Sequence, residues 1–309
     1  MSATVAAVPA KSKTVWYFCL LALASLMWSG QGIAVKILNR HMEPVAITFL
    51  PFYITTALFL PFLWKGKRAT SPSASDWIRL VVAGVAGQVL AQLGMTWGIS
   101  KSLASNGAIL NLLIPVITAV LASLMLKERI TWLRAGSLII GLAGVLLLSV
   151  GDLKQASFRE MRFLVGNTLI LGGCLGSSFY NVFCKGLMQR FSEIDILTFS
   201  YITASLASIP LLVWVEPFSF RTFGFFDWRD WAAFVFLALF MYGASMLLFF
   251  AALQHLDVTT ASASLYLVPV FGVLLATVVL GERLSRLAII GAATVLIATL
   301  LIMKYDTSY

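Results

Sequence analysis

The chain has 309 residues, of which 60% are hydrophobic and only 11% are charged. An average soluble domain is about 25% charged, so a soluble globular fold is excluded. The formal net charge is +9, but the basic residues are scattered over short segments between apolar runs. That distribution is typical of membrane topology and of contact with anionic lipid headgroups, and it argues against nucleic acid as a partner.

Ten apolar segments follow one another, each close to the roughly 20 residues that a helix needs to cross a bilayer. They comprise residues 15–35, 44–64, 77–97, 104–126, 132–150, 164–184, 194–214, 231–253, 258–280 and 287–303. All are predicted to be helices, because an open sheet would leave backbone groups unpaired in hydrocarbon. The first is interpreted as a span rather than a cleaved signal peptide, since equally apolar segments follow it. Residues 218–231 are expected to rest in the membrane interface.

The fourth and ninth segments share a sequence repeat. When Pro115 is placed on Pro269, an offset of 154 residues, seven of fifteen positions match without a gap, among them Glu128-Arg129 and Glu282-Arg283. A weaker match pairs Lys36 with Lys185 and Tyr53-Ile54-Thr55 with Tyr201-Ile202-Thr203. The repeat unit therefore contains five helices.

An odd number of helices in a repeat makes the second copy enter the membrane from the opposite side, which gives inverted repeats. This architecture is typical of secondary transporters with a substrate site near the midplane. We expect a cytoplasmic tail over residues 1–14, a first repeat over 15–150, a connecting loop over 151–163, a second repeat over 164–303 and a tail over 304–309.

The loop charges predict the orientation. In the first half, nine Lys and Arg residues lie on the N-terminal side of the membrane and three on the other, whereas the second half gives three and seven. Early helices usually dominate the orientation. Both termini are therefore predicted to be cytoplasmic, in a multi-pass protein of the cytoplasmic (inner) membrane.

Several motifs resemble the ten-helix, EamA-domain type of the drug/metabolite transporter superfamily over nearly the whole chain. They are Trp28-Ser29-Gly30 followed by Lys36, Pro44 at the start of the second helix, and two copies of Pro followed thirteen residues later by Glu-Arg. The resemblance implies export or exchange of small metabolites, amino acids among them. Many members carry an Arg early in the second helix, where this chain has Leu50-Pro51-Phe52-Tyr53.

Uncharged polar and aromatic side chains inside the spans are the candidate substrate ligands, because pockets combine apolar walls with a few polar groups. The candidates are Trp28, Gln31, Gln88, Gln92, Trp97, Asn111, Tyr180, Asn181, Tyr242, Ser245 and Tyr266. Hydrogen bonding between helices is the alternative role for the amides. Pro115 and Pro269 are candidate hinges or static kinks.

No Asp or Glu lies in the middle of a predicted span, although a proton relay or cation site in the membrane would need one. No cofactor, metal site or disulfide framework is expected, since Cys19, Cys174 and Cys184 all fall in apolar segments. Glu128-Arg129 and Glu282-Arg283 are interpreted as loop anchors at helix ends.

The sequence thus favours a secondary transporter for a small polar or zwitterionic, amino-acid-like metabolite, which works by alternating access as an exporter. We expect a small-molecule substrate, membrane lipids as the surroundings, and a chain that can act as a monomer. A membrane-embedded enzyme and a receptor or scaffold without transport are the alternatives. Neither is favoured, because no catalytic constellation or exposed interaction module is apparent.

Overall fold

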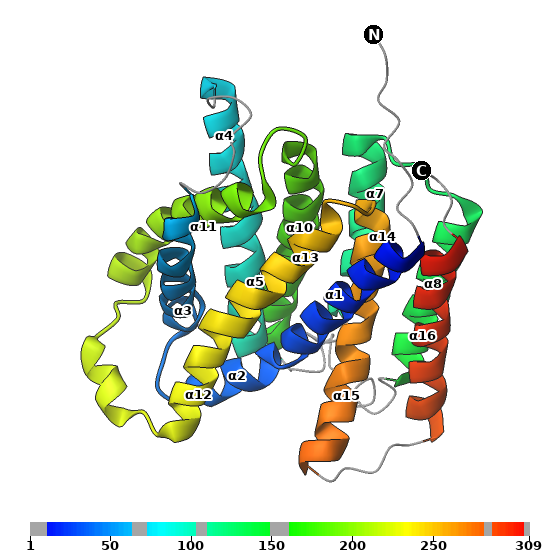
Figure 1. Ribbon diagram of the computed structural model, residues 1–309. Coiled ribbons are helices and arrows are strands. Elements are labelled where there is room, and N and C mark those ends of the chain that lie inside the picture. Colours follow the sequence, from blue (N-terminus) through cyan, green and yellow to red (C-terminus); the bar gives the residue numbers. More distant parts are fainter. Residues whose placement is uncertain (1–10, 64–72, 103–109, 149–160, 281–285, 306–309) are drawn as a thin grey trace.

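The computed structural model describes residues 11–63, 73–102, 110–148, 161–280 and 286–305, and every element in these ranges is helical (Figure 1). Apolar composition and capping residues set the helix positions. Pro44 occupies the first turn of its helix, where a missing N–H costs nothing. Ser73 with Asp76, and Asp227 with Asp230, form capping boxes at the starts of two others.

The first half contains α1 (Lys11–Ser29), α2 (Gln31–Leu38), α3 (Pro44–Phe59), the short 3-10 helix η1 (Leu60–Phe62), α4 (Ala74–Val82), the π-helix η2 (Ala83–Val89), α5 (Leu90–Lys101), α7 (Leu113–Leu126) and α8 (Trp132–Leu148). The second half begins with α10 (Met161–Leu187), α11 (Glu193–Pro210), the π-helix η3 (Leu211–Val215) and the 3-10 helix η4 (Phe220–Phe225). It continues with α12 (Trp228–Phe236), the π-helix η5 (Leu237–Ala244), α13 (Ser245–Leu253), α14 (Val258–Ala263), η6 (Ser264–Tyr266), α15 (Leu267–Leu280) and α16 (Arg286–Tyr305).

Five helices in the described ranges are long and apolar enough to cross a membrane: Val15–Leu38, Pro44–Phe62, Ala74–Lys101, Glu193–Val215 and Trp228–Leu253. Several others are shorter but apolar. Large aliphatic and aromatic side chains remain exposed on the outside, including Leu124 and Ile139 at 74% and 67%. In water such a surface would aggregate, so the chain is a multi-pass membrane protein.

The first predicted span differs in detail from the structure. Residues 15–35 were expected as one helix, but the helix is interrupted at Gly30 and continues to Leu38. A Cβ on Gly30 would lie 2.7 Å from Cζ of Phe236, so glycine allows the close approach of α12 at this point. Residues 218–231 contain a 3-10 turn, and Phe220, Phe225, Trp228 and Trp231 are exposed there. Phe218, Phe223 and Phe226 pack against the core.

Equivalent contacts occur in the two halves. Ser25 Oγ donates to the Ser264 carbonyl at 3.0 Å, and Cys174 Sγ donates to the Leu110 carbonyl at 3.5 Å. Cys174 is 149 residues beyond Ser25 and Ser264 is 154 beyond Leu110, the same offsets that relate Lys36 to Lys185 and Pro115 to Pro269. The two repeats therefore make the same contact with each other twice.

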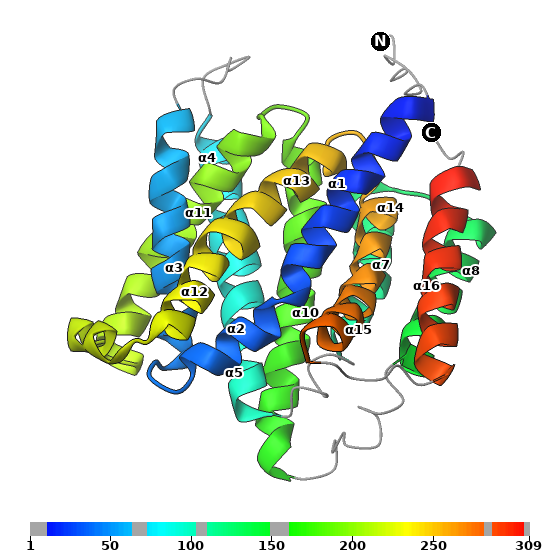
Figure 2. The ribbon, with the colours of Figure 1, turned by 60° about the horizontal axis from the view of Figure 1, so that its bottom comes forward.

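The matched helices run in opposite directions. From start to end, α1 runs down the molecule in Figures 1 and 2, whereas α10, its counterpart by sequence, runs up. The start of α1 lies near the end of α16, and α8 packs along α16 at one side of the bundle. We call the end where α1 begins and α10 and α13 finish the Lys185 end, and the opposite end, where α3 and α12 begin, the Glu216 end.

Some expectations fall outside the described residues. These are the structure of Glu282-Arg283, of the tails up to residue 10 and beyond residue 305, and of most of the expected connecting loop over 151–163.

Candidate functional site

Two π-helices lie at matching positions of the two repeats. The segments η2 and η5 begin at Ala83 and Leu237, which are 154 residues apart. Gln88 and Tyr242, both predicted ligands, are related by the same offset, and both are buried. A π-helix is rare and frequently marks a functional site, because its wider turn displaces backbone carbonyls from their regular partners.

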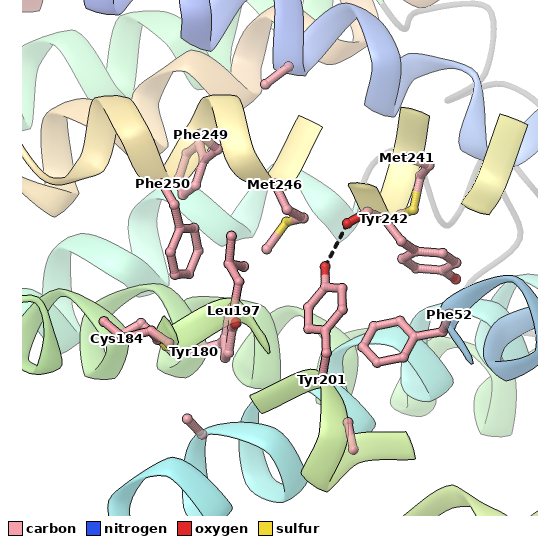
Figure 3. Close-up of a cluster of buried hydrophobic side chains, with 14 of the residues drawn as sticks. Phe52, Tyr180, Cys184, Leu197, Tyr201, Met241, Tyr242, Met246, Phe249 and Phe250 are labelled. Carbon is pink, nitrogen blue, oxygen red and sulfur yellow. Dashed lines mark hydrogen bonds between the residues drawn. The ribbon is translucent and has the colours of Figure 1, made fainter. Parts of the chain in front are cut away.

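Side chains from neighbouring helices hydrogen-bond the carbonyls of η5. Tyr201 of α11 donates its hydroxyl to the Tyr242 carbonyl at 2.8 Å, as the dashed line in Figure 3 shows, and Thr55 of α3 donates to the Ala238 carbonyl at 2.6 Å. The Phe52 ring lies against Tyr201 and Tyr242, with centroids 4.1 and 5.3 Å away. The π-helix is therefore fixed by both repeats.

The corresponding region around η2 is built from amides and a tyrosine. Gln92 donates its side-chain amide N–H to the side-chain oxygen of Gln88 at 3.1 Å, so these two amides pair with each other. Gln88 also hydrogen-bonds Tyr180 of α10. Tyr180 of α10 packs against Gly87, where a Cβ would lie 2.7 Å from its ring. The Tyr180 hydroxyl bonds Ser200 Oγ at 2.8 Å.

The remaining predicted ligands are distributed along the bundle. Trp28 packs on Phe249 with ring centroids 5.3 Å apart, and Ser245 of α13 donates to the Met241 carbonyl. Gln31 and Asn111 are half-buried, and Asn181 is buried. The structure thus brings Gln88, Gln92, Tyr180, Tyr242 and Ser245 to the middle of the bundle. It places Trp97 at the Glu216 end, away from that group.

Tyr266 differs from the other tyrosines. Its side chain is buried, and its hydroxyl has no hydrogen-bond partner among the described residues. A Cβ on Gly141 of α8 would lie 2.6 Å from its ring, so a glycine makes room for it. An unpaired buried hydroxyl is costly, so a ligand that bonds it would remove this cost.

Both candidate hinges follow an interruption of their helix. Pro115 is the third residue of α7, and Pro269 is the third residue of α15, directly after the 3-10 turn η6. Each proline lies in a first turn, where no helical donor is lost. The matched breaks fit a hinge, and whether they move stays a prediction.

Charged groups hold the Lys185 end together, and one of them, Glu128, was interpreted as a loop anchor. Glu128 accepts the Val258 N–H at 2.8 Å and the Thr259 hydroxyl at 2.7 Å, so it caps the start of α14. The buried guanidinium of Arg134 pairs with Asp257. Lys185 Nζ donates to three carbonyls at the end of α13.

The Glu216 end is joined by a residue that sequence reasoning missed. The Glu216 carboxylate accepts hydrogen bonds from the Val45 N–H at 2.7 Å and from the Trp97 indole N–H at 2.5 Å. It thereby links the end of η3 to the start of α3 and to the end of α5. The available signal was a single Glu that ends an otherwise apolar run. Trp97 is thus a hydrogen-bond donor to this carboxylate in the structure.

An acidic residue meets a basic partner at matched positions of the two ends, but the partner is an arginine at one end and a histidine at the other. Asp76 pairs with Arg190 at 2.8 Å at the Lys185 end, and Asp230 lies 3.7 Å from His41 at the Glu216 end. Arg190 is 149 residues beyond His41, and Asp230 is 154 beyond Asp76. Nearby, the backbone N–H of Asp230, helped by that of Arg229, lowers the pKa of the Asp227 carboxyl.

The chain has relatives that match it over most of its length. A family model described as the EamA-like transporter family matches residues 15–150 and 164–304. A transporter of Archaeoglobus fulgidus, described as uncharacterized, is 26% identical over 286 residues, covering 92% of this chain and 98% of the relative. A probable terminal-alkyne amino-acid exporter of Streptantibioticus cattleyicolor is 25% identical, covering 95% and 94%.

Two further matches extend this picture. An S-adenosylmethionine uptake transporter of Rickettsia prowazekii is 23% identical over 297 residues, covering 93% of this chain and 91% of the relative. A solved crystal structure superimposes with a TM-score of 0.75 at 19% identity and covers 93% of this chain and 96% of its own. The latter match concerns the fold alone.

Proposed function

The chain belongs to the EamA-like transporter family, and on that premise we propose that it is a secondary transporter for a small, zwitterionic, amino-acid-like metabolite. It has ten membrane helices in two inverted five-helix repeats, spanning residues 15–150 and 164–303, and exports its substrate across the cytoplasmic membrane by alternating access. Both termini are cytoplasmic.

The matched contacts of the two repeats carry the transport proposal. The same pair of positions meets twice, as Ser25 with Ser264 and as Cys174 with Leu110. A pseudo-twofold arrangement of this kind has two related conformations, in which the repeats exchange roles and the site faces opposite sides of the membrane. Polar groups on matched π-helices, Gln88 and Tyr242, lie in the middle of that arrangement.

The chemistry of the middle of the bundle supports the substrate class. Every described Asp and Glu lies in the first turn of a helix or between helices. Amides and hydroxyls therefore provide the polarity deeper inside, and they suit a ligand without net charge. The names of two relatives, an amino-acid exporter and an S-adenosylmethionine uptake transporter, both denote compounds that carry an α-amino-acid group.

The substrate ligands we propose are the uncharged candidates of the sequence analysis, with Pro115 and Pro269 as hinges. Gln92 is the sharpest test, because its amide is half-buried and contributes one hydrogen bond, to Gln88. One hydrogen bond is worth roughly 0.5–1.5 kcal/mol, so two lost bonds of about 0.7 kcal/mol each correspond to roughly tenfold in affinity.

The experiment measures flux in proteoliposomes that contain the purified protein. Vesicles are loaded with unlabelled amino acids, nucleosides or sugars, and labelled compound of the same class is added outside. We expect exchange of amino acids alone, with an apparent KM about tenfold higher in Gln92→Ala. Ser29→Ala, an exposed hydroxyl bonded within its own turn, serves as the matched control. Absence of exchange for every compound would contradict the proposal.

A further inference from the structure

A pocket opens at the Lys185 end, where the two repeats meet. Its volume is about 280 Å³, and it is lined by Leu126, Glu128, Lys185, Met188, Gln189, Gln254 and Asp257. The lining comes from α7 and the turn after it, from α10 and the turn after it, and from the segment between α13 and α14. The ends of α7, α10, α13 and α14 lie together there in Figure 1. A volume near the lower limit of known ligand pockets fits a metabolite of amino-acid size.

The cationic wall of this pocket is the ammonium group of Lys185. It donates to the carbonyls of Leu253 at 2.6 Å, Gln254 at 3.1 Å and Leu256 at 2.9 Å. These carbonyls end α13 or follow it directly, where the helix dipole favours a positive charge. Lys185 thus ties the end of α10 to the end of α13, with all three donors on neutral acceptors.

The anionic wall consists of Asp257 and Glu128. The Asp257 side chain is 27% exposed and pairs with Arg134, whereas Glu128 is 11% exposed and is engaged by the start of α14. Asp257 is therefore the more accessible of the two carboxylates. With Arg134 behind them, the two carboxylates and the two basic groups sum to no net charge.

We propose that this pocket is a second binding site for an α-amino acid zwitterion, in addition to the ligands in the middle of the bundle. The substrate ammonium lies against Asp257 and Glu128, and its carboxylate lies against Lys185, with the amides of Gln189 and Gln254 beside it. A zwitterion matches the pocket because both of its charges find an opposite charge and the net charge stays zero. The choice of substrate class rests on the proposed function.

Binding in the pocket also loosens the link between α10 and α13. A carboxylate is a stronger acceptor for an ammonium than a neutral carbonyl, because its full negative charge adds a Coulomb attraction between the two groups. The substrate carboxylate therefore draws Lys185 away from the end of α13. Because the ligand prefers the released arrangement of Lys185, it shifts the protein toward a conformation that is open at this end.

The test measures protection of a cysteine placed in the pocket wall. Gln189 is exposed, and Gln189→Cys is made in a Cys19→Ser background, because Cys19 is exposed whereas Cys174 and Cys184 are buried. The rate of alkylation by a charged maleimide is measured in the detergent-purified full chain. The probes are L-norvaline, its amide, which lacks the negative charge, and pentanoate, which lacks the positive charge.

We expect saturating norvaline to slow alkylation roughly tenfold, as about 90% occupancy requires, and each singly charged probe to slow it less than twofold. Lys185→Met and Asp257→Asn each abolish the protection, and Lys185→Arg restores part of it. Asp257→Asn keeps the shape of its side chain and so remains informative if Lys185→Met does not fold. Lys36→Met, the same change at the matched exposed position of the first repeat, leaves the protection intact.

Absence of protection by norvaline would overturn the pocket site, and so would equal protection by all three probes. Norvaline exchange is measured in proteoliposomes in parallel. The two measurements together show whether the pocket proposal or the proposed transport function has failed. Exchange without protection leaves a transporter that has no site in this pocket. Protection without exchange of any amino acid keeps the pocket and overturns the transport proposal.

Discussion

The two ends of the bundle have matching folds but different charges. At the Lys185 end, Glu128, Arg134, Asp257 and Lys185 link helices of the two repeats through full charges. At the Glu216 end, one carboxylate joins three helices, and the matched lysine, Lys36, is exposed. The sequence has Leu103 where the repeat would place the counterpart of Asp257. Duplication thus preserved the helices, while their ends diverged.

Different interactions therefore hold the helices together at the two ends. A charged cluster can be loosened by a charged ligand, because ligand and protein compete for the same ion pairs. At the other end, the Glu216 carboxylate accepts the backbone N–H of Val45. A charged ligand competes less well for a bond of this kind than for an ion pair. We therefore expect charge substitutions to act most strongly at the Lys185 end, and the predictions below run from the largest effect to the smallest.

Arg134→Met should cause the largest loss. Arg134 is 1% exposed and pairs with Asp257 and Glu128. Its removal leaves the two carboxylates without their buried guanidinium partner, which typically costs about 3 kcal/mol. Thermal unfolding of the purified protein measures the effect. Arg190→Met at the same end removes a pair whose basic side chain is 47% exposed, so it should cost less than about 1 kcal/mol. Equal losses would contradict the special role of the cluster.

The contact between α5 and α10 gives the next effect. A Cβ on Gly173 would lie 2.8 Å from the backbone nitrogen of Met95, whereas one on the neighbouring Gly172 would meet only Leu90 Cδ1 at 3.9 Å. Gly173→Ala should therefore push the helices apart and cost about 1–3 kcal/mol. Gly172→Ala should be neutral or slightly stabilising, since alanine favours helices. A similar unfolding temperature for both variants would show that the two helices are not closely packed.

Tyr201→Phe tests the fixing of the π-helix η5. The substitution removes the donor to the buried Tyr242 carbonyl and should lower stability by about 1 kcal/mol. Tyr53→Phe, at the matched position of the first repeat, removes a half-buried bond to Ser208 Oγ and should cost less. Urea unfolding of the two variants side by side checks the order. The reverse order would mean that the Tyr201 bond does not hold η5.

Asp227→Asn should have the smallest effect, and the effect should depend on pH. Because the folded state lowers the pKa of this carboxyl, its charge stabilises the protein above the unfolded pKa of about 3.9. That contribution is lost as the pH falls through the lower, folded pKa. Asn keeps the cap and removes only the charge. The variant should therefore melt slightly below the parent at pH 7 and together with it at the lowest pH tolerated. A constant difference at all pH values would exclude this cause.

Much of the architecture follows from composition and repetition. Apolar runs of bilayer length predict the helices, and the offset that relates Pro115 to Pro269 also relates the π-helices η2 and η5. The π-turns themselves were not predicted, because the donors that fix η5, Thr55 and Tyr201, belong to other helices. Local sequence contains no sign of such a partner.

The polar contacts were harder to predict than the helices. Gln88 and Gln92 are four residues apart and so share one face of a helix, but the sequence does not show that Gln92 donates to Gln88. The repeat pairs Lys185 with Lys36, but the sequence does not show that Lys185 binds the end of α13, which lies 68 residues away in sequence at Leu253. Charges at helix ends can be recognised from the chain, but their partners depend on packing.

Alternating access through the inverted repeats is the central claim, and distances across both ends test it most directly. Spin labels are placed in pairs, at Arg129 and Gln189 for the Lys185 end and at Arg40 and Arg229 for the Glu216 end. Both distances are then measured in nanodiscs with and without L-norvaline. Norvaline should lengthen one distance distribution and shorten the other. Changes in the same direction at both ends, or no change while norvaline exchange persists, would contradict alternating access.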